Sequence, residues 1–94
     1  MYKVHWSTVA VSDLDSIYNY IGQYSAAYAS IFISKIFQAI ETLIKFPLSG
    51  RVVPEFDLDR MREVLIFKNY RLIYQITDKK IEIIAIHHQS RKIV

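Results

Sequence analysis

The stretch that decides the fold runs from Arg60 to His88 and holds three short apolar segments, MREVLIF (61–67), YRLIYQIT (70–77) and IEIIAIHH (81–88). Val, Ile, Tyr and Phe fill these segments, and residues of these types favour strands. Asn69 and Asp78 stand in the short connections, where a tight turn tolerates unusual backbone angles. The pattern predicts an antiparallel meander of three strands that the rest of the chain covers.

Working outward toward the N-terminus, apolar and polar residues alternate over 2–6, which predicts a first strand. A helix follows, with Ser7 or Thr8 as its cap and Gly22 at its end. Ser25 can cap a second helix, which Pro47 stops. Its apolar residues recur at steps of three and four: Ala29, Phe32, Ile33, Ile36, Phe37, Ile40, Leu43 and Ile44. We therefore expect both Phe32 and Phe37 in the core.

Together these elements predict an α+β domain of the order strand, helix, helix, strand, strand, strand. The two helices are joined by few residues, so they should form a hairpin packed on one face of a four-stranded sheet. The first strand should lie beside the last strand or a middle one. A chain of 94 residues forms one domain, 1–94.

Composition narrows the classes of function. Cysteine is absent, which excludes disulfides and thiolate metal sites, and we expect no metal and no cofactor. No run reads as a membrane span or signal peptide, so a cytoplasmic protein without membrane contact is expected. Residues 51–94 hold nine Lys or Arg against six acids, whereas 1–50 hold three of each sign. This basic half favours a polyanion or an acidic protein as partner, although a solvated surface explains it equally well.

Several motifs, in this order and spacing, resemble one family. They are AVSDL (10–14), PLSGRVVPE (47–55), RE (62–63), YRLIY (70–74) and IEIIAIHHQSR (81–91). The chain resembles the RelE/ParE superfamily of toxins from type II toxin-antitoxin systems over nearly its whole length. The resemblance implies growth inhibition in the cytoplasm and a cognate antitoxin that binds the toxin in a hetero-oligomer.

The resemblance leaves the target open, because its members divide into two branches. One branch consists of ribosome-dependent mRNA endonucleases, or mRNA interferases, which act on ribosome-bound mRNA. The ParE branch poisons DNA gyrase by binding, without catalysis. Whether the chain is an enzyme therefore stays undecided. The residues of its motifs resemble the ParE branch somewhat more closely.

For the nuclease, the resemblance assigns roles to individual residues. Metal-independent RNA cleavage needs a base, cations for the charge on the phosphorane, and an acid. Glu55 stands in a PE context like that of the catalytic glutamate of YoeB-like nucleases, and Arg71 matches their strand arginine. His87 or His88 could supply the acid, since imidazole titrates near neutrality. Further positive charge for a phosphate or target could come from Arg51, Arg62 and Arg91.

Each candidate also has an architectural explanation. Glu55 and Arg71 could pair with each other near the sheet. Arg62 and Glu63 alternate sides on a strand, so at least one faces solvent. His87 and His88 point to opposite faces for the same reason, so at most one shares a site with Arg71. The sequence also lacks the His-Tyr pair that the nuclease pattern places two positions later, where Gln89 and Ser90 stand.

Overall fold

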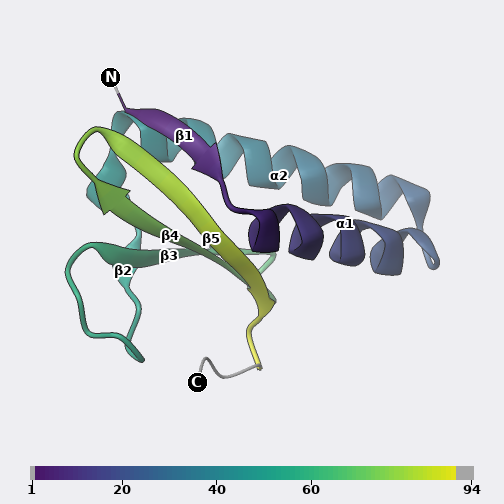
Figure 1. Cartoon of the computed structure of the whole chain (residues 1–94). Coiled ribbons are helices and arrows are strands. Elements are labelled where there is room, and N and C mark those ends of the chain that lie inside the picture. Colours follow the sequence, from purple (N-terminus) through teal and green to yellow (C-terminus); the bar gives the residue numbers. More distant parts are fainter. Residues whose placement is uncertain (1, 91–94) are drawn as a thin grey trace.

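The structure is a computed structural model that describes residues 2–90, and it contains two long helices and five strands (Figure 1). In chain order the elements are β1 (Lys3–Trp6), α1 (Thr8–Gly22), α2 (Ala26–Lys45), the 3-10 helix η1 (Pro47–Ser49), β2 (Arg51–Val52), β3 (Met61–Ile66), β4 (Tyr70–Thr77) and β5 (Lys80–His88). The predicted α+β order is confirmed.

The strands form one mixed sheet of order β1-β5-β4-β3-β2. β3, β4 and β5 are the predicted antiparallel meander, and β1 lies parallel to β5 with Lys3 opposite Lys80. Of the two places expected for the first strand, beside the last strand or beside a middle one, the structure shows the place beside the last strand. The expected four strands become five, because Arg51 and Val52 pair with Glu63 and Arg62 as a short edge strand. This pairing depends on a distant partner, so the local pattern did not reveal it.

Each helix begins at a serine cap. The hydroxyl of Ser7 accepts a hydrogen bond from the amide of Ala10, and the hydroxyl of Ser25 accepts one from the amide of Tyr28. α1 ends at Gly22, and α2 ends two residues before Pro47. A turn of only a few residues thus folds the helices into a hairpin.

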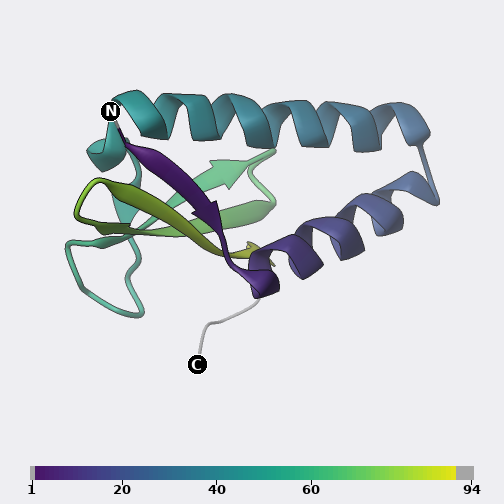
Figure 2. The same cartoon turned by 45° about the horizontal axis from the view of Figure 1, so that its top comes forward.

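The helices lie together on one side of the sheet (Figure 2), and their contact with it forms the main core. Phe32 and Ile36 from α2 are fully buried there with Leu72, Tyr74 and Ile83 from the sheet. Phe37 is not part of this core, contrary to expectation. It is 50% exposed, because helical rotation places it at the edge of the apolar face, where its ring lies beside Trp6.

Helix α2 is long and apolar enough to cross a membrane by length and composition alone. Five of its residues are buried, and they belong to the main core against the sheet. Packing on the sheet therefore explains the buried face of α2, whereas Ile31 and Phe37 on the same helix stay about half exposed.

No helix formed by residues 2–90 covers the opposite face of the sheet. A second, small apolar cluster of Val53, Met61 and Ile73 lies there. The loop that joins β2 to β3 projects away from the helices on this side (Figure 1). Val53 anchors this loop through its buried side chain and through a hydrogen bond that its backbone amide donates to the carbonyl of Met61. This uncovered face carries the candidate site.

Candidate functional site

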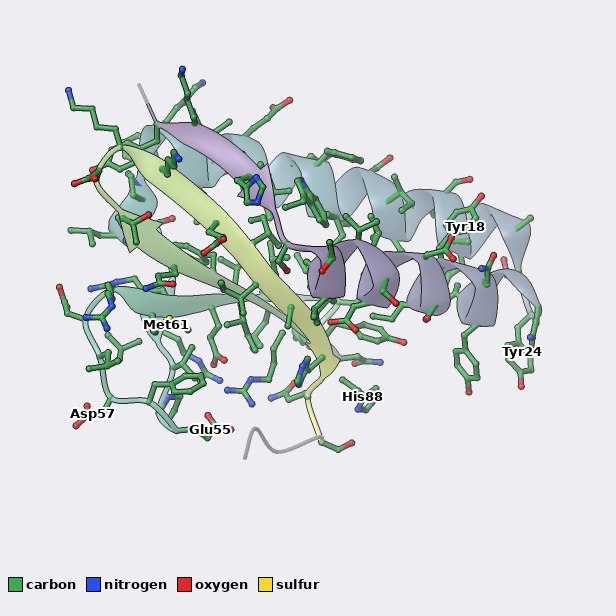
Figure 3. The ribbon with its side chains drawn as sticks, viewed as in Figure 1. Tyr18, Tyr24, Glu55, Asp57, Met61 and His88 are labelled. Atoms are coloured by element: carbon green, nitrogen blue, oxygen red, sulfur yellow. The ribbon has the colours of Figure 1, made fainter. Side chains whose placement is uncertain are left out.

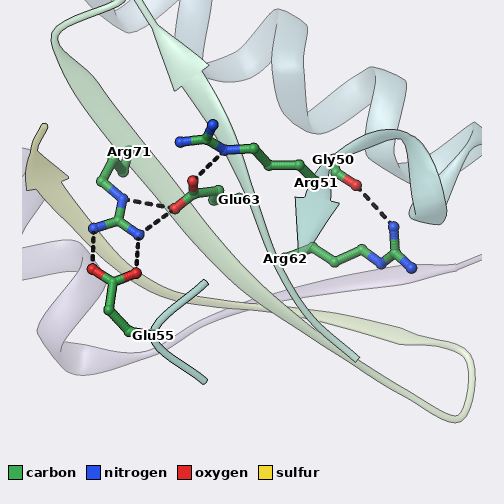
Figure 4. A network of polar contacts seen from close by, with 6 residues as sticks. All are labelled: Gly50, Arg51, Glu55, Arg62, Glu63 and Arg71. Carbon is green, nitrogen blue, oxygen red and sulfur yellow. Dashed lines mark hydrogen bonds and ion pairs between the residues drawn. The ribbon is translucent and has the colours of Figure 1, made fainter. Parts of the chain in front are cut away.

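Four charged side chains form one network on the uncovered face (Figure 4). The guanidinium of Arg71 on β4 makes a bidentate contact with the carboxylate of Glu55, at 2.9 and 2.7 Å. Its Nε also donates to Oε1 of Glu63 on β3, at 2.6 Å. The other oxygen of Glu63 accepts from Nε of Arg51 on β2. Three adjacent strands and one loop therefore meet in this network.

The network is more buried than its charges would suggest. The side chain of Glu63 is fully buried and that of Arg71 is 6% exposed, whereas Arg51 keeps 58% of its side chain in solvent. The hydrogen bonds that Arg71 donates to Glu55 raise the pKa of Arg71 above its ordinary value, although burial acts in the opposite direction. Two cations and two carboxylates balance one another, so the four groups together carry no net charge.

Strand geometry explains why these residues meet. Side chains alternate between the two faces of a strand, and directly opposite residues share a face. Arg51 lies opposite Glu63, which places both on the uncovered face. Glu55 reaches Arg71 from the loop that Val53 anchors, as Figure 3 shows with Glu55 beneath the sheet. The sequence-based pairing of Glu55 with Arg71 is thus present in the structure.

Arg62 lies outside this network. Its guanidinium donates to the backbone oxygens of Leu48, Gly50 and Asp59, and it pairs with the Asp59 carboxylate at 2.8 Å. Only 13% of its side chain is exposed and Glu63 is fully buried, so the expectation that at least one of the two faces solvent is wrong. These hydrogen bonds join β3 to the η1–β2 segment and to the loop between β2 and β3. The contacts of Arg62 therefore support an architectural role.

The two histidines separate as strand alternation requires. His87 lies directly opposite Arg71 in the β4–β5 register, so it shares the uncovered face. Its Nδ1 is buried and has no hydrogen-bond partner among residues 2–90. His88 lies opposite Tyr70, and its ring contacts the Tyr70 ring at 5.4 Å on the helix side. Of the two, only His87 could act together with Arg71.

Arg91 lies outside the described residues, so its predicted role stays a prediction. Glu63 is the residue of the network to which the sequence assigned no role. Its one signal in the sequence was that it stands two residues after Met61, on the same face of the predicted strand. Within residues 2–90, no three side chains of His, Asp or Glu come together as a metal site.

Comparison with known proteins agrees with this fold. The family described as "ParE toxin of type II toxin-antitoxin system, parDE" matches residues 4–93. The chain belongs to this ParE toxin family. It is 30% identical to Toxin RelE2 of Caulobacter vibrioides over 97% of the chain and 99% of that protein.

Two solved structures share the fold of this ParE-family toxin. The chromosomal ParDE system from P. aeruginosa contains a chain with a TM-score of 0.74 at 21% identity, and the match covers 94% of this chain and 96% of that one. HP0894 from Helicobacter pylori gives a TM-score of 0.56 at 11% identity, with 97% and 98% covered. The chain is therefore a toxin of the RelE/ParE superfamily from a type II toxin-antitoxin system, and family membership implies an antitoxin partner.

Proposed function

We propose that this ParE-family toxin arrests growth by binding DNA gyrase in the cytoplasm, without catalysing RNA cleavage. The observation that carries the proposal is the state of Arg71. All three of its guanidinium nitrogens are bonded to the carboxylates of Glu55 and Glu63. The best candidate for a phosphate-binding cation is thus already neutralised within the protein.

A nuclease on this face would need a different arrangement. A cation that stabilises the phosphorane must reach the phosphate, and a general base must reach the 2′-hydroxyl. Here the proposed cation and the proposed base hold each other, with Arg71 almost out of solvent. For Arg71 to take a phosphate, Glu55 would have to leave it, and the buried Glu63 would still neutralise part of its charge.

One observation favours the second candidate, a ribosome-dependent mRNA endonuclease. His87 lies on the same face as Arg71 and opposite it, with an Nδ1 that no described residue bonds. An imidazole in this place could protonate a leaving oxygen once Glu55 had moved. Under this alternative Glu55 is the base, Arg71 and Arg51 bind the phosphate, and His87 is the acid.

Two cell-free assays on the purified toxin separate the candidates. We expect the toxin to inhibit gyrase supercoiling, and primer extension on a translated mRNA to find no new cleavage sites. His87→Gln should inhibit gyrase as well as the unchanged toxin does, because binding does not need a general acid. Addition of the purified cognate antitoxin should restore supercoiling. Ribosome-dependent cleavage that His87→Gln abolishes, in a variant that still unfolds cooperatively, would overturn the proposal.

A further inference from the structure

The inference concerns a small pocket on the helix side, between the first turns of α1 and the end of β5. It is separate from the network of Arg71. The pocket has a volume of about 250 Å³ and is lined by Asp13, Ser16, Ile17, Tyr70, Ile86 and His88. This volume lies below the ~300–1,000 Å³ typical of sites for drug-sized ligands. It suits one side chain rather than a small-molecule substrate.

The pocket exists because β1 is shorter than the strand that it pairs with. β1 ends at Trp6 opposite Ile83, whereas β5 continues to His88. Within the part of the chain that the structure describes, no strand therefore lies beside the edge of β5 beyond Ile83. α1 crosses this edge, and Asp13 fills part of the gap by accepting a hydrogen bond from the amide of Ile86 at 3.0 Å. Asp13, which belongs to the AVSDL motif, thus has a structural role at the edge of β5, apart from the network of Arg71.

The Asp13 bond to Ile86 uses only Oδ2. A carboxylate has two oxygens with about four acceptor positions, so Asp13 keeps acceptor capacity for a donor that enters the pocket. Asp13 is half-buried, and its position is fixed by the sheet edge rather than by a flexible surface chain. The pocket therefore contains an anchored negative charge, and its lining includes no Lys or Arg.

The other side of the pocket is aromatic. The rings of Tyr70 and His88 meet edge to face at 5.4 Å, and Tyr70 also packs against Phe32 in the core. A cation near an aromatic ring gains electrostatic energy from the ring, and Arg gains it most often. Ser16 adds a hydroxyl that can accept a hydrogen bond. An anchored carboxylate, an aromatic wall and a hydroxyl acceptor are together complementary to a guanidinium or ammonium group.

We propose that this pocket is a specificity site that receives an arginine or lysine side chain of a protein partner, with Asp13 as its counter-ion. Charge complementarity carries the choice of occupant, because Asp13 is the one carboxylate among the described residues that line the pocket, and no Lys or Arg stands beside it there. A charge-assisted bond to an anchored carboxylate is stronger than one to a mobile surface group. The proposal does not depend on whether the toxin acts on gyrase or on mRNA.

The test is an NMR titration of the full-length toxin with N-acetyl-arginine amide, with the neutral isostere N-acetyl-citrulline amide as the ligand control. Resonances of Asp13, Ser16, Tyr70 and His88 should shift with the arginine derivative and saturate on the order of millimolar concentration. The citrulline derivative should bind at least about tenfold more weakly, because it lacks the charge.

Two variants separate the pocket charge from a structural effect. Asp13→Asn keeps an oxygen that can accept from the Ile86 amide, so it should fold normally yet bind the arginine derivative at least about tenfold more weakly. Asp15→Asn is the matched control, since it removes the same charge from the same helix outside this pocket, and its binding should be unchanged.

The titration is repeated on the double variant Arg91→Gln/Lys92→Gln, so that the protein's own cations near its C-terminus cannot compete for the pocket. Binding of equal strength in Asp13→Asn, or equal binding of the citrulline derivative, would overturn the proposal. So would an absence of saturable shifts in both the unchanged toxin and the double variant.

Discussion

Arg71 and Arg51 contact the same carboxylate, yet they should differ in their effect on stability. Arg71→Met leaves the Glu63 carboxylate fully buried with only one partner, and removing one member of a buried pair typically costs about 3–5 kcal/mol. Arg51 is mostly exposed, so Arg51→Met should lower the free energy of unfolding by about 1 kcal/mol or less. Urea denaturation of the two variants measures both values. Equal losses in the free energy of unfolding would show that the burial of an arginine does not determine how much it stabilises the protein.

Tyr74 links the pH dependence of stability to the turn after α2. Its hydroxyl donates to the carbonyl of Pro47 at 2.6 Å and accepts from the amide of Gly50 at 3.0 Å. Burial raises the pKa of Tyr74, and it also raises the pKa of Tyr70. The folded state therefore holds these phenolic protons more tightly than the unfolded chain does.

The direction of the pH effect follows from these raised values. The stabilisation is complete below the unfolded pKa of about 10 and is lost as the pH rises through the folded values. We therefore expect the free energy of unfolding to fall above about pH 10. Tyr74→Phe should reduce this fall, and at pH 7 it should cost about 1–3 kcal/mol because two backbone groups lose their partner. Tyr24→Phe is the control, since Tyr24 is 76% exposed, and it should leave the pH profile unchanged.

The hairpin between β3 and β4 contains backbone strain that its sequence does not relieve. Phe67 and Lys68 are the two central residues of the turn, and both have positive φ, 58° and 65°. A turn of this kind favours Gly and Asn. The Phe67 ring offsets part of the cost, because it stacks on Tyr28 of α2 at 5.1 Å and 7°. The turn therefore joins the meander to the helical hairpin.

Glycine at the second position of this turn should stabilise the protein. Lys68→Gly relieves the strain of the left-handed backbone, which is worth about 1–2 kcal/mol. It also makes the unfolded chain more flexible, which costs about 0.5–1 kcal/mol. We therefore expect the free energy of unfolding to rise by about 0.5–1 kcal/mol. Lys79→Gly is the matched control in the β4–β5 turn, where Asp78 has positive φ and Lys79 does not. It should destabilise the protein. Thermal unfolding decides the sign for each variant, and a loss in Lys68→Gly would contradict the strain argument.

Elements with local signals could be predicted from the sequence, and elements that depend on distant partners could not. Ser7, Ser25 and Pro47 mark helix ends within a few residues of themselves, and the structure confirms these ends. The two residues of β2 are a strand only because β3 lies beside them. Strand alternation predicted that one histidine at most would join Arg71, but choosing His87 required the β4–β5 register.

The candidate site also combines a feature that the sequence could predict with one that depends on distant partners. The sequence left two interpretations of Glu55 and Arg71, catalytic roles or an ion pair with each other, and the ion pair is present in the structure. The burial of Glu63 could not be deduced, because its partners arrive from two other strands, 12 residues before it and 8 after it. The charge balance of the site is thus a property of the assembled sheet.

The assembled toxin also exposes an apolar groove on its helical hairpin, which an antitoxin would be expected to cover. The groove has a volume of about 430 Å³ and is lined by Val11, Leu14, Asp15, Tyr18 and Ile33. Val11 is 52% exposed, so a charge there should not disturb the core but should oppose an apolar partner. We expect Val11→Glu to weaken antitoxin binding at least about tenfold, or about 1.4 kcal/mol, without weakening growth arrest.

Val9→Glu provides the matched comparison for this prediction. Val9 lies on the same helix and is 57% exposed, but it does not line the groove. Calorimetry with the purified antitoxin should therefore find nearly unchanged affinity for Val9→Glu. In cells, coexpressed antitoxin should neutralise this variant and fail to neutralise Val11→Glu. Equal affinity in the two variants would place the antitoxin on another surface, because only a contact made within the groove can distinguish two valines of similar exposure on one helix.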